Sequence, residues 1–209
     1  MFTGITEEIG SVVSAGKSPL VISANKAIKE LEIGGSVAVN GVCLTVTGFA
    51  ANQFSVDVMP ETVARTNIAQ LHPGSKVNLE TPLTVKKPLG GHLVQGHIDG
   101  TGKLVSVMEK GEALLLKFET HPEIMHYIVS KGFIAVDGIS LTIMESDGDY
   151  FTVSIVHYTR HNTTLGIKKP GELVNLEIDI IAKYVERFQK CYQPGITNDF
   201  LREHGFTTD

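Results

Sequence analysis

The chain has 209 residues, a net charge of −5 and a hydrophobic fraction of 42%. Its basic residues are scattered, whereas a surface that follows nucleic-acid phosphates needs clustered Lys and Arg, so nucleic acid is not an expected partner. No apolar run reaches the roughly 18–20 residues that cross a bilayer, so no membrane association is expected.

The first residues, MFTGITEEIG, have neither the basic start nor the apolar stretch of a secretion signal. Cys43 and Cys191 are the two cysteines of the sequence, and they provide neither a disulfide scaffold nor a zinc motif. Reduced thiols and a cytoplasmic location are therefore expected.

Short alternating runs predict β-strands in chain order. Within residues 42–47, Val42, Leu44 and Val46 point to one side, with Cys43 and two threonines on the other. Residues 54–59 and 139–143 alternate in the same way, and 21 glycines supply turns. This pattern favours an antiparallel sandwich or a closed barrel, which has no exposed sheet edges.

Two helices are predicted as well. Residues 121–132, HPEIMHYIVSKG, are expected to form one helix that ends at Gly132. The tail DIIAKYVERFQKC has apolar residues at Ile181, Tyr184, Val185 and Phe188, which is helical spacing with one apolar face. Such a face needs a partner, and a second subunit is the simplest one.

The chain also repeats itself. A shift of 97 places NGVCLTV on DGISLTI, and a shift of 92 applies nearer the N-terminus. The matched ranges are 2–14 with 94–106, 40–46 with 137–143, 54–68 with 151–165, and 73–80 with 170–177. Four matches in the same order predict a duplicated domain, with the five-residue difference placed in a loop.

Three regions follow from this repeat. Residues 1–87 form the first copy, 88–181 the second, and 182–209 a tail that has no counterpart in the first copy. The joint lies near residues 85–92, where Pro88, Gly90 and Gly91 predict a linker.

The copies differ at four informative positions. Ile5 corresponds to His97, Gly34 to Lys131, Pro82 to Asp179, and Cys43 to Ser140. A charge placed in a core without a partner is costly. The gain of an imidazole, an ammonium and a carboxylate in the second copy therefore suggests one equipped pocket and one simpler pocket.

Each of these residues also has a purely structural interpretation. Lys131 could be a solvated turn residue, His97 a structural histidine, Ser140 a partner within its sheet, and Asp179 a cap for the tail helix. His92 and His97 are five residues apart, which places them on opposite faces of a strand, so no metal site is expected.

The stretches MFTGI, NGVCLTV, GGHLVQGHIDG, KGFIAVDGISLTI and VNLEIDIIAKYVER together resemble the riboflavin synthase family, alpha-chain type, over nearly the whole chain. The resemblance implies an all-β fold of two tandem homologous six-stranded Greek-key barrels plus a C-terminal α-helix. It also implies a homotrimer whose active site lies between subunits, with no metal or organic cofactor.

The implied reaction joins two molecules of 6,7-dimethyl-8-ribityllumazine. One donates a four-carbon unit to the other, giving riboflavin and 5-amino-6-ribitylaminouracil. Proton removal from the 7-methyl group points to His97 as the proton-transfer residue, because imidazole changes charge near neutral pH. Ser140 and Cys43 are candidate hydrogen-bond donors or nucleophiles, and Lys131 and Asp179 are candidate anchors.

The resemblance also implies substrate-binding residues, which we group by copy. The first group is Gly4, Ile5, Thr6, Cys43, Leu44, Thr45, Asp57, Val58, Met59, Pro60, Glu61 and Thr62. The second group is Gly96, His97, Ile98, Lys131, Ser140, Leu141, Thr142, Ile155, Val156, His157, Tyr158, Thr159 and Arg160. The last segment departs from the family pattern, since it reads VHYTRHNTTLG where PETLERTTLG is typical.

Other interpretations stay open at this point. A lumazine- or flavin-binding antenna protein of the same fold would bind the chromophore without turnover. A flavin-binding barrel of an oxidoreductase would need a strand–loop–helix dinucleotide motif, which the glycines at 90, 91 and 96 do not provide. A possible association with lumazine synthase as a partner is left open as well.

Overall fold

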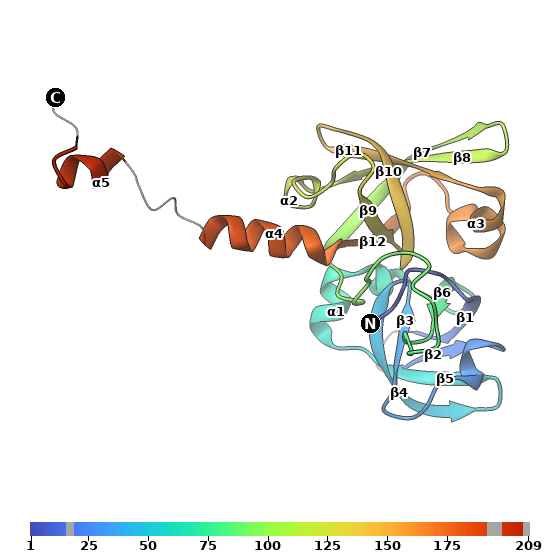
Figure 1. The fold of residues 1–209 in the computed structure, drawn as a ribbon. Helices are drawn as coiled ribbons and strands as arrows, with labels where there is room; N and C mark the ends of the chain where they lie inside the picture. The colour runs from blue at the N-terminus through green and yellow to red at the C-terminus, as the bar shows by residue number, and fades with distance from the viewer. Residues whose placement is uncertain (16–18, 192–197, 207–209) are drawn as a thin grey trace. The chain divides into compact units, whose positions relative to one another are not determined.

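The first repeat folds into a closed antiparallel barrel of six strands in the computed structural model, which describes residues 1–15, 19–191 and 198–206 (Figure 1). The strand order around the barrel is β1-β2-β5-β4-β3-β6. The strands are β1 (Glu8–Ser14), β2 (Leu20–Ser23), β3 (Ser36–Val39), β4 (Val42–Ala50), β5 (Gln53–Asp57) and β6 (Lys76–Glu80). Strands distant in sequence pair, as in a Greek key.

The second repeat closes in the same order, because β7, β8, β11, β10, β9 and β12 follow one another around its barrel. These strands are β7 (Gly100–Lys110), β8 (Ala113–Thr120), β9 (Phe133–Val136), β10 (Ile139–Asp147), β11 (Tyr150–Ile155) and β12 (Leu173–Ile178). The predicted pair of six-stranded barrels is confirmed.

Irregularities in the strands are duplicated too. The register of β1 shifts between Val12 and Ser14, and that of β7 shifts between Leu104 and Ser106. Strands β4 and β10 carry a matching pair of shifts, between Val46 and Gly48 and between Ile143 and Glu145. The hairpin of the second copy is longer, since β7 and β8 have 11 and 8 residues against 7 and 4 in β1 and β2. The length difference therefore lies mainly in the strands of this hairpin, and the expectation that it lies in a loop is wrong.

The predicted alternation of side chains is observed. Val42, Leu44 and Val46 are buried in the first barrel core, and Cys43 is only half-buried. Ile139, Leu141 and Ile143 are buried in the second copy, where Ser140 is half-buried. The polar members of both motifs thus lie outside the apolar cores and remain available to a ligand.

The predicted helix over residues 121–132 is wrong. Only α2 (Pro122–Met125) is helical, and turns follow it. The Lys131 amide donates to the Ile143 carbonyl at 2.8 Å, which ties the end of this segment to β10. The chain must therefore turn into β9 instead of continuing as a helix.

Short helical turns close the barrels at matched places. In the first copy these are α1 (Pro60–Arg65) and the 3-10 turns η1 (Ala27–Lys29) and η2 (Asn67–Gln70). In the second copy they are α3 (His157–Asn162) and η3 (Thr164–Gly166). Helix α3 forms although it lacks the proline that starts α1.

Both barrels belong to one compact unit, Met1–Asp179, and a second unit begins at Ile180. The second unit contains α4 (Ile180–Cys191) and α5 (Asn198–Glu203). The predicted tail helix is thus confirmed, and Ile181, Tyr184, Val185 and Phe188 are all more than half exposed on α4. No helix among the described residues is both long and apolar enough to span a membrane.

A buried polar seam joins the barrels, and its hydrogen bonds come in matched pairs. Asn78 Nδ2 donates to the Asp137 carbonyl at 3.0 Å, and Asn175 Nδ2 donates to the Asn40 carbonyl at 2.9 Å. The turn at residues 40–41 also contacts the turn at residues 137–138, since a Cβ on Gly41 would lie 2.6 Å from the Gly138 nitrogen. Buried polar groups need partners, so this seam fixes how the barrels are placed.

Glu8 supplies a test of local stability. Its carboxylate accepts hydrogen bonds from the amides of Asn25, Lys26 and Ala27 at 2.7, 2.8 and 2.8 Å, which caps the turn that follows β2. Burial alone would raise the pKa of Glu8, but the three amides and Lys26 together lower it.

We predict that Glu8→Gln lowers the free energy of unfolding at pH 7 by about 1 kcal/mol, because the charge-assisted bonds are lost. A carboxyl with a lowered folded-state pKa stabilises above its ordinary value of 4.5, and that stability is lost as the pH falls through the folded-state pKa. Urea unfolding measures the difference in free energy of unfolding between the unmodified chain and Glu8→Gln. This difference should be smaller at pH 3 than at pH 7. The exposed Glu112 provides the control Glu112→Gln, and an equal loss there would contradict the assignment.

Candidate active site

Each barrel is preceded by a leading segment, defined as residues 2–6 for the first and 94–98 for the second. Buried glutamates hold these segments. Glu80 accepts from the amides of Thr3 and Gly4 at 2.7 and 3.0 Å, and Glu177 accepts from those of Gln95 and Gly96 at 2.6 and 2.9 Å. The segments also pair with each other, because Phe2 bridges Val94.

The leading segments cross between the barrels. The Ser140 amide of β10 donates to the Gly4 carbonyl at 2.8 Å, and the Cys43 amide of β4 donates to the Gly96 carbonyl at 2.9 Å. The first leading segment therefore completes the surface around Ser140, and the second completes the surface around Cys43.

This crossing corrects the grouping of the predicted site residues by copy. Gly4 and Ile5 do not belong with Cys43, and Gly96, His97 and Ile98 do not belong with Ser140. The expectation of one equipped and one simpler pocket is corrected as well, since His97 lies beside Cys43 of the other copy. The repeat matched equivalent residues accurately, but the repeat alone gives no information on which barrel each segment contacts.

Glycine is required at both crossing points. Gly4 and Gly96 have φ values of 76° and 84°, in the left-handed region that other residues rarely adopt. A Cβ on Gly4 would lie 2.6 Å from Ser140 Cβ, and one on Gly96 would lie 2.5 Å from Cys43 Cβ. The backbone can approach each motif this closely only because no side chain intervenes.

The surface around Cys43 is a pocket of about 210 Å³. Its walls come from β4, α1 and the second leading segment. The lining residues are Val42, Cys43, Glu61, Thr62, Arg65, Thr66, Gly96, His97 and Ile98. Six of the predicted residues are thus brought together here: Cys43, Glu61, Thr62, Gly96, His97 and Ile98.

Sequence reasoning missed Val42, Arg65 and Thr66 as lining residues of this pocket. Arg65 forms an ion pair with Glu61 one turn earlier on α1. Thr66 matches Thr163 in the repeat, which was a usable signal. Arg65 matches Asn162, so a basic group at the pocket edge was visible as a further difference between the copies.

The surface around Ser140 contains His92, which sequence reasoning considered only as a possible metal ligand and rejected in that role. His92 Nδ1 lies 2.7 Å from Ser140 Oγ, and the His92 ring stacks on Phe133 with centroids 5.4 Å apart. Burial lowers the pKa of His92, and the nearby Asp179 opposes that shift. His92 therefore belongs to this surface as a neutral imidazole. Ile5 contacts the linker two residues before His92, since a Cβ on Gly90 would lie 3.3 Å from Ile5 Cγ1.

Comparison with known proteins gives the family. The lumazine binding domain family matches residues 3–82 and 95–179, once for each barrel. The chain belongs to the lumazine-binding, riboflavin synthase family. It is 43% identical to the riboflavin synthases of Actinobacillus pleuropneumoniae and Bacillus subtilis (strain 168), over 99% of this chain and 100% of each relative.

A solved structure agrees with this family. LumP complexed with 6,7-dimethyl-8-(1′-D-ribityl) lumazine superposes with a TM-score of 0.77 at 26% identity, covering 85% of this chain and 99% of LumP. The similarity thus extends over both barrels of the family fold.

Lys131 occupies a left-handed turn with φ of 65°, where its counterpart Gly34 has φ of 82°. A side chain in that conformation costs roughly 1–2 kcal/mol. The two backbone amides make equivalent hydrogen bonds. The Lys131 amide donates to the Ile143 carbonyl and the Gly34 amide donates to the Val46 carbonyl, both at 2.8 Å. The turn is thus the same in both copies, and they differ in the exposed ammonium that Lys131 has and Gly34 lacks.

The remaining predicted residues differ in accessibility. Leu44, Leu141 and Ile155 are buried in the barrel cores, so only their backbone is available to a ligand. Several others are exposed on α1, α3 or nearby strand ends: Thr45, Asp57, Met59, Pro60, Thr142, Val156, His157 and Tyr158. Thr6, Val58, Thr159 and Arg160 are half-buried.

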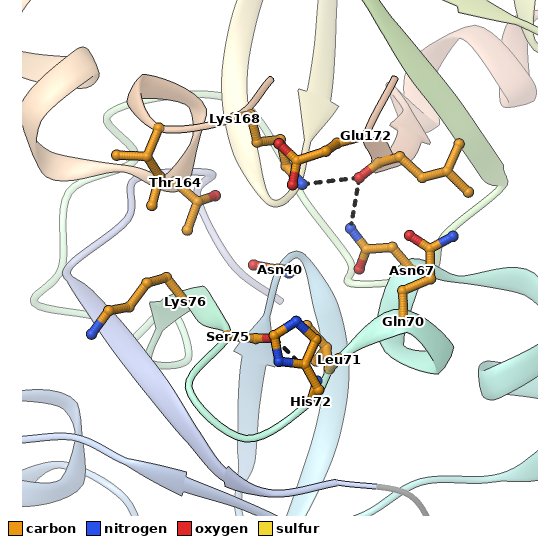
Figure 2. Close-up of a pocket in the computed structure, with 12 residues that line it drawn as sticks. Asn40, Asn67, Gln70, Leu71, His72, Ser75, Lys76, Thr164, Lys168 and Glu172 are labelled. Carbon is orange, nitrogen blue, oxygen red and sulfur yellow. Dashed lines mark hydrogen bonds between the residues drawn. The ribbon is translucent and has the colours of Figure 1, made fainter. Parts of the chain in front are cut away.

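A separate cavity of about 240 Å³ lies between the barrels, and none of the predicted site residues lines it. Lys168 and Asn67 both donate to the Leu173 carbonyl, at 2.9 and 3.3 Å. Dashed lines in Figure 2 mark these hydrogen bonds of Lys168 and Asn67. Lys168 Nζ also lies 3.3 Å from the buried Asp137, whose pKa is raised by burial against the effect of Lys168. These groups belong to the seam that joins the barrels.

The crossing predicts which glycine controls which pocket. We expect Gly96→Ala to change the rate at which iodoacetamide alkylates Cys43, because the new Cβ collides with Cys43 Cβ. Gly4→Ala is the matched control, since it carries the same backbone strain but disturbs Ser140. Mass spectrometry of the Cys43 peptide measures the rate. Equal rates in both variants would contradict the crossed arrangement.

Proposed function

We propose that the chain catalyses the riboflavin synthase reaction. Two molecules of 6,7-dimethyl-8-ribityllumazine react, and one transfers a four-carbon unit to the other. The products are riboflavin and 5-amino-6-ribitylaminouracil. The atoms of the two substrates equal those of the two products, so the reaction needs no outside oxidant or reductant.

The observation that carries this proposal is the crossed pair of related surfaces at Cys43 and Ser140. Two identical reactants are served by two sites with the same frame. They cannot have the same role, because one gives carbon and the other receives it. The differences Cys43 against Ser140 and Ile5 against His97 supply the required asymmetry.

Binding of the two substrates holds their flat rings in the geometry needed for reaction. Holding two reactants in place can contribute several kcal/mol to the barrier reduction. His97, exposed at the rim of the Cys43 pocket, is the proposed proton-transfer group for the acidic 7-methyl. Lys131 and Asp179 are proposed to anchor polar parts of the substrate.

The assembly is proposed as a homotrimer in the cytoplasm, with each active site formed between subunits. The apolar face of α4 supports association, because its exposed Ile181, Tyr184, Val185 and Phe188 gain by burial. In class terms the enzyme is a transferase, and no metal or organic cofactor takes part in the proposed reaction.

A lumazine-binding protein without turnover is the second candidate, since LumP of the same fold is seen complexed with the lumazine. The enzyme is favoured because His97 and Cys43, the proposed proton-transfer group and a candidate nucleophile, line the same pocket. A passive chromophore cradle does not need these groups.

Purified protein incubated with the lumazine alone should therefore form riboflavin, with two lumazines consumed for each riboflavin. Absorbance and chromatography of both products measure the ratio. The variant His97→Gln, with ligand binding checked separately, should slow a single turnover by about 10²-fold or more, as expected for loss of a proton-transfer group. Binding without any riboflavin formation would leave only the second candidate.

A further inference from the structure

His92 makes a contact that the proposed mechanism has not used. Its Nδ1 lies 2.7 Å from Ser140 Oγ, and the residue is only 6% exposed. The backbone holds it there, because the His92 amide donates to the Thr3 carbonyl at 3.2 Å. Stacking on Phe133 with an interplanar angle of 14° fixes the ring.

The segment before His92 is packed tightly against the same serine. A Cβ on Gly91 would lie 2.3 Å from the Thr3 carbonyl oxygen and 2.8 Å from Ser140 Oγ. The linker between the copies therefore passes directly over Ser140. Cys43, the matched residue, instead packs against an apolar cluster that includes Phe2 and Val94.

The two nitrogens of His92 have different surroundings. Nδ1 faces Ser140, whereas Nε2 is buried without a hydrogen-bond partner among the described residues. A second proton on the ring would place an unpaired N–H in this buried site. That cost agrees with the lowered pKa of His92 and with a neutral ring.

A neutral imidazole carries its proton on one nitrogen. A proton on Nε2 would leave a buried N–H without an acceptor, which proteins rarely tolerate. A proton on Nδ1 is used in the bond to Ser140 Oγ and leaves only a lone pair unpaired. The surroundings therefore select the Nδ1–H tautomer, in which His92 donates and Ser140 Oγ accepts.

We propose that His92 is a positioning residue that donates Nδ1–H to Ser140 Oγ and so leaves the Ser140 hydroxyl proton for an oxygen or ring nitrogen of the bound lumazine. A hydroxyl has one proton to donate, and Ser140 is half-buried. In the proposed arrangement the bond to His92 does not use that proton. The inference rests on the proposed function for the identity of the ligand. It assigns Ser140 the role of hydrogen-bond donor, since a nucleophile would need Nδ1 to accept its proton.

The tautomer can be observed directly in the full chain. Labelling with ¹⁵N-histidine and recording the ring nitrogen shifts at pH 7 distinguishes protonated from bare nitrogens. The variant His92→Asn identifies the His92 signals among the eight histidines. A protonated Nδ1 supports the proposal, and a protonated Nε2 overturns it. This outcome does not depend on whether the chain turns over lumazine.

Ligand binding tests the consequence. Riboflavin titrations followed by fluorescence should show that Ser140→Ala and His92→Phe each weaken one site about threefold to tenfold, the value of one hydrogen bond. The double variant should be no weaker than either single one, because both remove the same bond. His92→Phe keeps the stacking on Phe133, and His92→Asn offers an amide donor near Nδ1 and should restore the affinity. Additive losses would overturn the proposal.

Single-turnover rates separate donation from proton removal. Asn can donate a hydrogen bond but cannot take up a proton, so His92→Asn should also retain a rate within about tenfold of the unmodified chain. Restored binding with a rate lowered about 10³-fold would show that His92 acts as a base, which contradicts the proposal. Failure of the unmodified chain to form riboflavin would instead refute the proposed function and leave the tautomer and binding results valid.

Discussion

Two buried carboxylates determine how this molecule is built. Glu80 and Glu177 each accept backbone amides from the leading segment of their own barrel, and those segments then pair with the opposite barrel. A buried carboxylate is tolerated only when such donors satisfy it. The interaction that anchors each segment is therefore also the one that delivers it to Ser140 or Cys43 of the other copy.

The duplication provides two similar surfaces that can bind the same kind of ligand. Two barrels with the same strand order and the same bulges provide two surfaces of the same shape. Because the segments cross, each surface combines residues of both copies. Each surface also has its own imidazole: the crossing segment brings His97 beside Cys43, and the linker brings His92 beside Ser140. Substitutions in either copy can thus alter one surface without changing the shared frame.

Much of the fold could be predicted because it depends on local periodicity. Alternation at Val42–Leu44–Val46 and the spacing of the α4 apolar face are properties of neighbouring residues. The crossing could not be predicted, since it depends on main-chain bonds such as Cys43 to Gly96, which join distant residues and leave no pattern in the side chains. The role of His92 was missed for the same reason, because only the folded linker brings it to Ser140. The helix over 121–132 failed because the Lys131 amide is bound by β10.

Activity in mixed assemblies tests the central proposal most directly, namely that one reaction needs an intact Cys43 surface and an intact Ser140 surface from neighbouring subunits of the proposed homotrimer. Gly96→Ala disturbs the first and Gly4→Ala the second, so assemblies of either variant alone should be inactive. Mixing both chains should restore up to about a quarter of full activity, since random cyclic assembly pairs the two intact surfaces at that frequency. No recovery in assemblies that native mass measurement shows to be mixed trimers would contradict the account.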